Sequence, residues 1–500
     1  MKTKLISVLI ITHLTFTTLF ATGGTKLLGY DAKTAGRAGV SFALFDSPTL
    51  MMTNPAGISF IGKSVLDANF SLMIPSVGFN NSINPDAKGE TNYFPMPSVG
   101  YINSNKDCDF TWGLGLYTQG GMGADFNLNH ALYKNQDGSY NPQEYHSQLA
   151  VMQFGPTVAY KITPNFSIGV SASLLYSTLE FKMPYSLSPS IMKGIANPST
   201  GMTFGDMFSA PPSAGGFGYN EVTALADMKE LSAFGFEGKI GFAYKLNDQV
   251  AFGLSYTSAS TLTYKNGKAT MDMTAQLNDA FGKAVQGAMS QGMSQADAQA
   301  AVMGQFAGMG IDLSKGAVAN YDLENELKLP QMIGFGASYK PSDNLSLALD
   351  LQWANWKEAF DKMSISLSNG SSANINTMLG NNGNFTLDFP MDWKDAIMVR
   401  LGVEYILNED VTLRGGYAYG SNPVPSSTVF PVFPAVVENH ITVGGGYKLT
   451  GNFSVNAAYE LVLNKDLTAD PVSKIASEYN NSVSSLSENL FHLSVSYSFN

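Results

Sequence analysis

The stretch LSLALDLQW at residues 345–353 decides the fold. Every second side chain in it is apolar, and the side chains between are Ser, Ala, Asp and Gln. A β-strand projects successive side chains to opposite faces, so this stretch has one apolar face and one small or polar face. The same pattern recurs as FSIGVSASL at 166–174 and as FSVNAAYEL at 453–461. Many such strands in one chain are typical of a transmembrane β-barrel whose apolar face meets lipid.

Fourteen segments of the chain show this alternation, an even number, as a closed antiparallel barrel with both ends on one side requires. The predicted strands are 66–79, 94–103, 109–119, 148–160, 166–180, 233–245, 250–264, 331–340, 345–357, 394–407, 411–421, 439–448, 453–464 and 489–499. Tight turns such as KITPN at 161–165 alternate with long, dissimilar connections. We expect the turns in the periplasm and the long loops outside. The predicted fold class is all-β, a transmembrane antiparallel β-barrel of about fourteen strands built from residues 65–500.

The beginning of the chain has the features of a signal peptide. Lys2 and Lys4 precede an apolar stretch at 5–20, and small residues begin at Ala21, so we predict a signal peptide over residues 1–21. Beyond it, no apolar run reaches the roughly eighteen residues of a transmembrane helix. The net charge of −11 argues against a nucleic-acid partner. The predicted location is the outer membrane.

Three segments do not fit the barrel wall, and one of them, residues 181–232, is predicted to be a long loop rich in Pro, Gly and Ser. Residues 22–64 are rich in Gly, Ala, Thr and Ser, and we expect them to form a plug, or hatch, inside the wide lumen. Residues 272–310 change to the spacing of an amphipathic helix and are predicted to form a helical outer loop. The apolar positions that carry this pattern are Leu277, Phe281, Val285, Met289, Val302, Phe306 and Met309. Either they pack on the barrel mouth, or they form a Met-rich surface that captures an apolar ligand.

Motifs for catalysis are absent from the sequence. There is no nucleophile–base motif, no metal-ligand spacing and no phosphate loop, and the histidines after the signal peptide are scattered at 130, 146, 440 and 492. We therefore expect no enzyme activity, no cofactor and no metal site.

The chain contains three arginines, of which Arg400 and Arg414 lie in predicted strands. Alternation directs both of them and Glu404 to the lumen, and the tight turn at 408–410 places Arg414 near Glu404. Either these charges form a ladder within the wall, or Arg400 and Arg414 bind a ligand carboxylate through two parallel hydrogen bonds.

Several short motifs carry a family resemblance. They are GRAG at 36–39, DSPT at 46–49, NPAG at 54–57, and LP at 329–330 followed by GFGASYKP at 334–341. With these motifs the chain resembles the FadL family of outer-membrane long-chain fatty-acid transporters, which includes hydrocarbon-uptake members of the TodX type. The resemblance implies that Asn54, Pro55 and Ala56 form an element of the hatch.

The resemblance also implies a route for the ligand. In that family the ligand is captured at the outer loops, bound in the lumen and released sideways into the bilayer through an inward kink of the third strand. Here the kink is expected among Gly113, Gly115, Gly120, Gly121 and Gly123, because glycine permits bulges and bends. The alternative is that these are ordinary glycines of a strand end. We further expect the Asn54-Pro55-Ala56 turn to lie beside this strand.

The function that the resemblance implies is passive uptake of long-chain fatty acids or related hydrophobic molecules by a monomer embedded in outer-membrane lipid. The barrel-assembly machinery is an expected partner, because the apolar residues Phe491, Leu493, Val495, Tyr497 and Phe499 alternate at the C-terminus, although Asn500 follows the usual terminal aromatic residue. The alternative is a porin-like or surface-adhesion barrel. The sequence leaves fatty acids, alkanes and aromatic hydrocarbons equally open as ligands.

Overall fold

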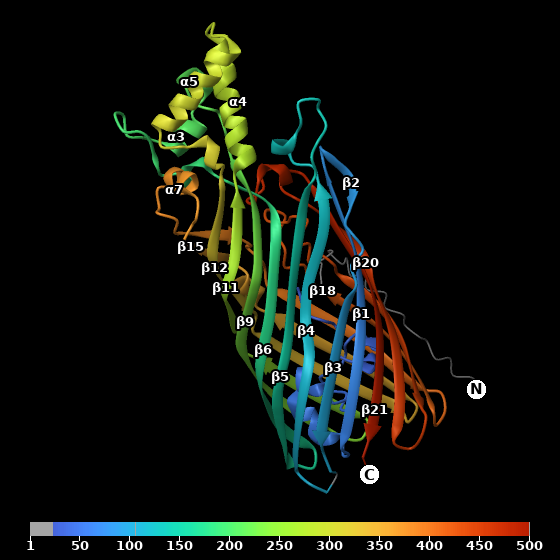
Figure 1. Ribbon diagram of the computed structural model, residues 1–500. Helices are drawn as coiled ribbons and strands as arrows, with labels where there is room; N and C mark the ends of the chain where they lie inside the picture. The colour runs from blue at the N-terminus through green and yellow to red at the C-terminus, as the bar shows by residue number, and fades with distance from the viewer. Residues whose placement is uncertain (1–23, 106, 500) are drawn as a thin grey trace, which may run out of the picture.

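The computed structural model describes residues 24–105 and 107–499, and fourteen strands of this described part close into an antiparallel barrel (Figure 1). In order around the wall they are β1 (Val65–Asn81), β3 (Phe94–Asn103), β4 (Phe110–Leu128), β5 (Gln143–Thr163), β6 (Phe166–Leu187), β9 (Val222–Lys245), β10 (Val250–Thr257), β13 (Met332–Ser342), β14 (Leu345–Ala354), β17 (Ala396–Ile406), β18 (Val411–Gly420), β19 (Asn439–Lys448), β20 (Phe453–Thr468) and β21 (Val483–Ser498). Pairing of β21 with β1, from Val65 opposite Ser498 to Asn80 opposite Val483, closes the ring. Each predicted range overlaps one of these strands, so the predicted fold is confirmed. The predicted signal peptide lies outside the described residues.

The two faces of the wall follow the alternation. On β17, Ile397 is 56% exposed and Leu401 is 51% exposed, whereas Arg400 between them is 5% exposed. The apolar side chains therefore face outward, where lipid surrounds a barrel of this kind, and the polar ones face the lumen.

On the loop side, part of the wall continues sideways beyond the ring. From the outer half of β9 the sheet runs through four more strands: β11 (Ser260–Asp272), β12 (Val318–Leu329), β15 (Lys362–Ser368) and β16 (Phe385–Pro390). The single strand predicted at 250–264 is thus two strands, β10 and β11, which have different neighbours, β13 and β12. Three further short strands lie outside the ring: β2 (Asn84–Lys88), which folds onto β1, and the pair β7 (Ile195–Asn197) and β8 (Met202–Thr203).

The longer helices gather at the loop end, opposite the C-terminus (Figure 1). They are α3 (Phe204–Ser209), α4 (Thr274–Ser290), α5 (Gln295–Gly308) and α7 (Ala373–Leu379), and a short helix, α6 (Trp356–Ala359), follows β14. The predicted helical loop is present, and Ser294 caps α5 by accepting a hydrogen bond from the Asp297 amide at 3.2 Å. Within the described residues, every helix is too short or too polar to cross a membrane.

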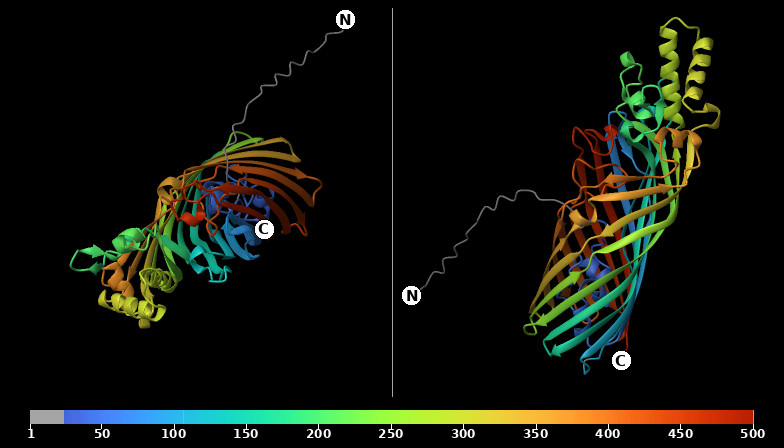
Figure 2. Two further views of the ribbon diagram at one scale, coloured as in Figure 1. Left: turned by 90° about the horizontal axis from the view of Figure 1, so that it is seen from above. Right: turned by 90° about the vertical axis from the view of Figure 1, so that its left-hand side faces the viewer.

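Residues 24–64 lie inside the barrel (Figure 2) and contain α1 (Ala32–Gly36), α2 (Leu50–Thr53) and the 3₁₀ turn η1 (Pro55–Phe60). Inward polar side chains of the wall accept hydrogen bonds from the hatch backbone. Asp350 accepts from the Ser41 amide at 2.8 Å, and Thr442 accepts from the Ala38 amide at 2.9 Å. The polar inner face of the barrel thus satisfies backbone groups that would otherwise be buried without partners.

A group of ion pairs joins the hatch to the wall. The Arg37 guanidinium, whose side chain is 1% exposed, donates to both carboxylate oxygens of Asp46, at 2.8 and 3.0 Å, and to Glu404 at 3.2 Å. Glu404 also accepts from Arg414 Nε at 2.6 Å, so the predicted proximity of these two side chains is confirmed. Burial is the largest single influence on Asp46 and opposes its ionisation, but the charge and hydrogen bonds of Arg37, together with the charges of Lys33 and Arg414, hold the Asp46 pKa well below its usual range. These pairs hold the hatch in one position.

Replacing Arg37 with Met should loosen the hatch. Removing one partner of a buried ion pair costs about 3–5 kcal/mol, and the partial exposure of Asp46 places this case near the lower end. We expect frequent channel openings in planar bilayers, whereas the control Lys63→Met, at an exposed residue before β1, should stay closed. A closed Arg37→Met barrel would show that the ion pairs do not hold the hatch.

The connection between β18 and β19, residues 421–438, turns into the barrel, and we call it the strap. Its apolar side chains are each at most 4% exposed: Val424, Val429, Phe430, Val432, Phe433, Ala435, Val436 and Val437. They belong to the large apolar cluster that fills the lumen on the loop side of the hatch. The expectation that every long connection points outward is wrong here, because burying these side chains removes apolar surface from water.

Candidate functional site

The wall is interrupted between β3 and β4. Their pairing runs only from Val99 opposite Leu116 to Asn103 opposite Trp112. Beyond Leu116, β5 is the one strand of the described chain that pairs with β4. A register shift between Thr118 and Gly120 marks the point of departure. Before this bulge the odd-numbered residues of β4 face inward, and beyond it Ala124, Phe126 and Leu128 do. One extra residue has therefore exchanged the two faces of the strand.

The five predicted kink glycines divide into two groups. Gly113 and Gly115 lie in the paired part of β4, where a Cβ would collide with Met51 of the hatch or with the Tyr117 ring. Gly120, Gly121 and Gly123 lie at or beyond the bulge. The first group thus makes room inside the barrel, and only the second group lies along the interruption.

The start of the hatch takes up part of the unpaired backbone of β4. The Gly121 amide donates to the Thr25 carbonyl at 3.0 Å, and Lys26 forms an antiparallel bridge with Gly120. A Cβ on Gly120 would overlap the Thr25 carbonyl oxygen, so the approach requires glycine. On the opposite edge, Pro95 and Pro97 of β3 carry no amide hydrogen that the gap would leave unpaired.

A cavity of about 280 Å³ lies behind this interruption. Apolar side chains of β1, β3 and the strap dominate its wall, including Met73, Val77, Phe94, Met96, Pro434, Ala435 and Val437. Gly120, Gly121 and Gly123 complete the lining on the β4 side. The interruption therefore borders a space suited to a small apolar group or to part of a long chain.

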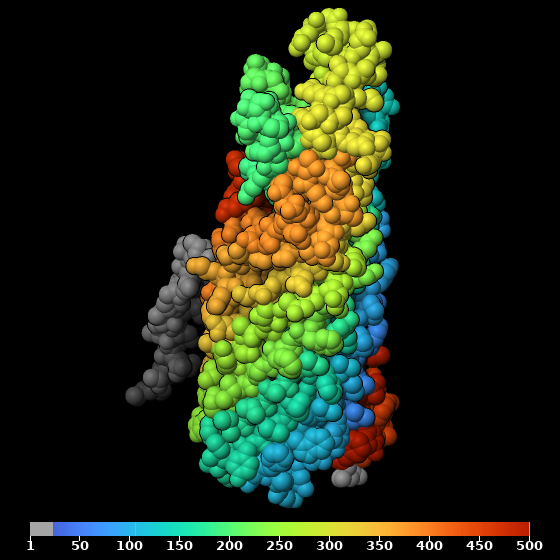
Figure 3. All heavy atoms as spheres, turned by 60° about the vertical axis from the view of Figure 1, so that its left-hand side comes forward, coloured from blue at the N-terminus to red at the C-terminus, as the bar shows by residue number. Residues whose placement is uncertain are grey.

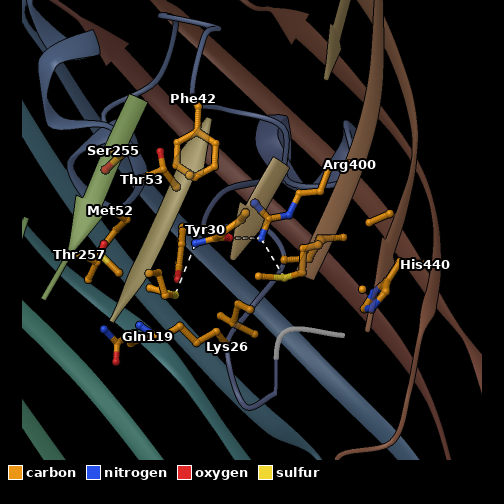
Figure 4. Close-up of a pocket in the computed structure, with 18 of the residues that line it drawn as sticks. Lys26, Tyr30, Phe42, Met52, Thr53, Gln119, Ser255, Thr257, Arg400 and His440 are labelled. Atoms are coloured by element: carbon orange, nitrogen blue, oxygen red, sulfur yellow. Dashed lines mark hydrogen bonds between the residues drawn. The ribbon is translucent and has the colours of Figure 1, made fainter. Parts of the chain in front are cut away.

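A second cavity, of about 50 Å³, lies between the hatch and the wall (Figure 4). Lys26, Lys239 and Arg400 line it, and in Figure 4 the Lys26 side chain runs toward Gln119 while Arg400 enters the cavity from another side. Glu237 bridges the two lysines, at 3.5 Å from Lys26 and 2.7 Å from Lys239. This volume fits a headgroup of carboxylate size better than a hydrocarbon chain.

Among the described residues that line this cavity, Arg400, Tyr419 and His440 each have a buried polar atom without a hydrogen-bond partner, and of these Arg400 carries a permanent positive charge. Its Nη2 donates to Gln352 Oε1 at 2.7 Å, while its buried Nε has no hydrogen-bond partner among the described residues. Asp350 of β14 lies directly across from Arg400 in the strand register, but its Oδ2 already accepts hydrogen bonds from the amides of Ser41 and Phe42. A bound carboxylate would supply the missing acceptor.

Arg414 does not share this position. Its Nε donates to Glu404 and its Nη1 donates to Asn456 at 3.0 Å, beside the hatch helix α1 rather than in the cavity. We therefore retain Arg400 alone as a candidate carboxylate ligand.

The Asn54-Pro55-Ala56 turn is fully buried but lies elsewhere than expected. Its backbone and side chains press on glycines of three strands: Gly169 of β6, Gly241 of β9 and Gly253 of β10. Asn54 Nδ2 donates to the carbonyls of Phe42, at 2.8 Å, and Phe242, at 3.0 Å. The expectation that this turn lies beside the third strand is wrong, because the glycines that admit its backbone belong to other strands. Bulky substitution at Ala56 would unseat the hatch rather than obstruct the gap.

The predicted apolar stripe of the helical loop is largely an internal interface. Leu277, Val285, Val302 and Phe306 are at most 8% exposed, and the rings of Phe281 and Phe306 meet edge to face at 6.1 Å. Met289, at 42%, is the exposed member of the stripe, and Met309 is half-buried. Figure 3 shows the hairpin of α4 and α5 projecting beside the loop before β9, and Tyr219 of that loop donates a hydrogen bond to Asp279 of α4 at 2.6 Å. The structure thus favours the packing interpretation for most of these residues and leaves Met289, Met293 and Met303 on the surface.

With the geometry established, comparison with known proteins gives the family. Residues 13–499 match the family described as outer membrane protein transport protein (OMPP1/FadL/TodX). The chain belongs to this family. Among relatives, outer membrane protein P1 of Haemophilus influenzae is 20% identical over 96% of this chain and 97% of its own length. The long-chain fatty acid transport protein of Escherichia coli K12 is 22% identical over 87% of this chain and 83% of its own length.

Two solved structures show the same fold. The toluene transporter TodX of Pseudomonas putida has a TM-score of 0.68 at 19% identity, covering 95% of this chain and 99% of TodX. A FadL homologue of Pseudomonas aeruginosa has a TM-score of 0.67 at 17% identity, covering 95% of this chain and all of that structure. Together with the barrel, family membership makes this chain an outer-membrane protein of a transport family.

Proposed function

We propose that this protein mediates passive uptake of long-chain fatty acids or related hydrophobic molecules across the outer membrane, with lateral release into the bilayer. The observation that carries the proposal is the interruption between β3 and β4, which opens onto an apolar cavity. A porin would need an open aqueous lumen, whereas here the hatch and the strap occupy it.

The driving force is the hydrophobic effect, at about 0.8 kcal/mol per CH₂ group removed from water. A ligand that moves from the outer loops through the apolar lumen into the membrane stays out of water, and this route needs no energy source and no catalytic group. We propose that the protein acts as a monomer and that its direct contacts are the ligand, outer-membrane lipid and, during insertion, the barrel-assembly machinery.

Uptake measurements test this function directly. Cells that carry the protein should accumulate radiolabelled palmitate or toluene faster than cells that lack it, and purified barrels should show no steady channel in planar bilayers. A large steady conductance without any hydrophobic uptake would favour the porin-like alternative.

Names of the relatives leave open whether the ligand is a fatty acid, as for the Escherichia coli protein, or an aromatic hydrocarbon, as for TodX. The unpaired Arg400 Nε in a cavity of headgroup size favours a carboxylate. We propose that Arg400, together with Lys26 and Lys239, orients the charged end of a fatty acid while its chain lies toward the apolar cavity.

Arg400→Gln should separate the two ligand classes. A hydrogen bond to a charged group contributes about 1.5–3 kcal/mol, so palmitate affinity should fall about ten- to a hundredfold. Affinity for hexadecane, which has the same number of carbons and no charge, should change little. Titration of the detergent-solubilised variant with both ligands measures this difference.

Arg414→Gln serves as the matched control, because it should act through the hatch and affect both ligands alike. If Arg400→Gln lowers the affinities for palmitate and hexadecane equally, Arg400 does not belong to the site.

A further inference from the structure

The strap reaches from one side of the barrel to the other. Counted from β1, β5 and β6 are the fourth and fifth strands of the wall, and β18 and β19 are the eleventh and twelfth, so the two pairs face each other across the lumen. Phe433 of the strap nevertheless contacts Phe181 of β6, with ring centroids 6.0 Å apart. Ser147 of β5 donates a hydrogen bond to the Val432 carbonyl. Residues between β18 and β19 therefore cross the whole lumen.

The two ends of the strap are fixed by hydrogen bonds. Ser421 exchanges bonds with the backbone of Ile397, at 2.7 Å each, and Thr428 Oγ1 donates to the Met391 carbonyl at 2.6 Å. At the other end, the buried carboxylate of Glu438 pairs with Lys465 at 2.8 Å. Fixed ends let the centre move without detaching the strap from the wall.

Apart from the hydrogen bond from Ser147 to the Val432 carbonyl, apolar side-chain contacts hold the centre of the strap. The Phe430 ring meets Phe389 of β16 at 5.2 Å and Tyr479 at 6.2 Å, in addition to Phe181. Contacts of this kind are non-directional and roughly proportional to buried area, so another apolar group of similar size can replace them. A polar solute cannot, because it would leave the strap and the lumen walls without an apolar partner.

The strap also borders the space behind the wall interruption. Pro434, Ala435 and Val437 form part of the 280 Å³ cavity, while Phe430 and Phe433 fill the lumen nearer the loops. A ligand that travels from the loops to the interruption must therefore pass the strap, and it meets strap side chains at both stages.

We propose that the strap is the selectivity element of this transporter: its central residues occupy the ligand path, yield to apolar molecules and exclude polar ones. The inference rests on the proposed uptake function and adds the element that selects the ligand. Phe430 and Phe433 limit the size of molecule that enters, and Pro434, Ala435 and Val437 shape the cavity from which it leaves.

Deleting the strap tests this role without disturbing the wall. Tyr419 and Asn439 are direct partners across β18 and β19, so a two-residue Asn-Gly turn can replace residues 420–438. Heat-dependent mobility on gels verifies that the variant folds. We expect initial palmitate uptake to rise about fivefold or more, since an obstructing step is removed, and the bulkier probe N-phenyl-1-naphthylamine to enter as well. Unchanged rates and an unchanged ligand range would overturn the proposal.

Locking the strap gives the opposite test. In a Cys108→Ser background, Ser147→Cys and Val432→Cys should form a disulfide across the lumen, which mass spectrometry verifies. In oxidised cells the uptake rate should be about tenfold lower and should recover with reductant, because the disulfide stops the centre of the strap from moving aside. Each single-cysteine variant is the control.

If wild type takes up ligand and the deleted and locked variants match it, only the strap inference fails. If wild type itself takes up neither palmitate nor toluene, the uptake function fails and the strap inference fails with it.

Discussion

Leu349→Lys is expected to prevent stable assembly of the barrel in lipid. Leu349 lies near the middle of β14, opposite Leu401 of β17, and lines a shallow apolar hollow on the outer wall. A cation on the lipid face of a barrel costs about 2–4 kcal/mol near the bilayer midplane and much less near the interfaces. Urea titration of the variant in lipid vesicles, followed by tryptophan fluorescence, should show a loss of stability of this size.

Ser346→Lys is the matched control on the same strand. Ser346 projects to the opposite face and lies across from Glu404 in register, so the new cation gains an acidic neighbour. This variant should fold nearly as well as wild type. Equal losses in the two variants would mean that the outward and inward faces of β14 have been interchanged.

Alternation predicts the strands of this chain where the lumen side is polar, and it fails where the lumen side is apolar. In β6, Leu174 and Tyr176 face lipid while Leu175, Leu179 and Phe181 face the apolar cluster inside. Both faces are then hydrophobic, and the period of two disappears from the sequence. Alternation therefore predicts that β6 ends at residue 180, whereas the strand continues to Leu187.

Alternation does not predict the strap, because it identifies strands and leaves the connections between them to be placed in water. One signal was present, since residues 421–438 contain eight apolar side chains that the structure buries. A solvent-exposed loop of that composition would be a large apolar patch, which soluble surfaces rarely show. Composition could therefore have indicated burial, but not the wall against which the strap packs.

Candidate site residues were predicted with uneven success for a related reason. A hydrophobic pattern defines which face of a helix is apolar but not what covers it. The apolar faces of α4 and α5 pack mainly against each other, as the contact between the Phe281 and Phe306 rings shows. The Asn54 turn depends on Gly169, Gly241 and Gly253, which are far apart in sequence and lack a local signature. Arg400 was identifiable because alternation alone directs it to the lumen, whereas the engagement of Arg414 with Asn456 requires the register of β18 through β20.

Gly120→Val is expected to abolish uptake while leaving the barrel in the membrane. A Cβ at this position overlaps the Thr25 carbonyl oxygen and comes within 3.0 Å of Lys26 Cα, so the hatch start must leave the β4 edge. A β-branched residue also favours regular strand pairing over a bulge. Both effects change the interruption itself. Arg400 and Lys239, which belong to the wall strands β17 and β9, keep their places, whereas Lys26 moves with the hatch start.

The test separates release from binding. Palmitate uptake by Gly120→Val cells should fall about tenfold or more, as for loss of a gating step, while surface levels stay close to wild type. Palmitate affinity of the purified protein should fall much less than uptake, because Arg400 and Lys239 stay in the cavity and only Lys26 is displaced. Gly415→Val on β18 is the matched control, because a Cβ there finds ordinary contact distances, 3.6 Å to Val403 Cγ1. Normal uptake by Gly120→Val would contradict lateral release between β3 and β4, and would direct attention to a path through the hatch instead.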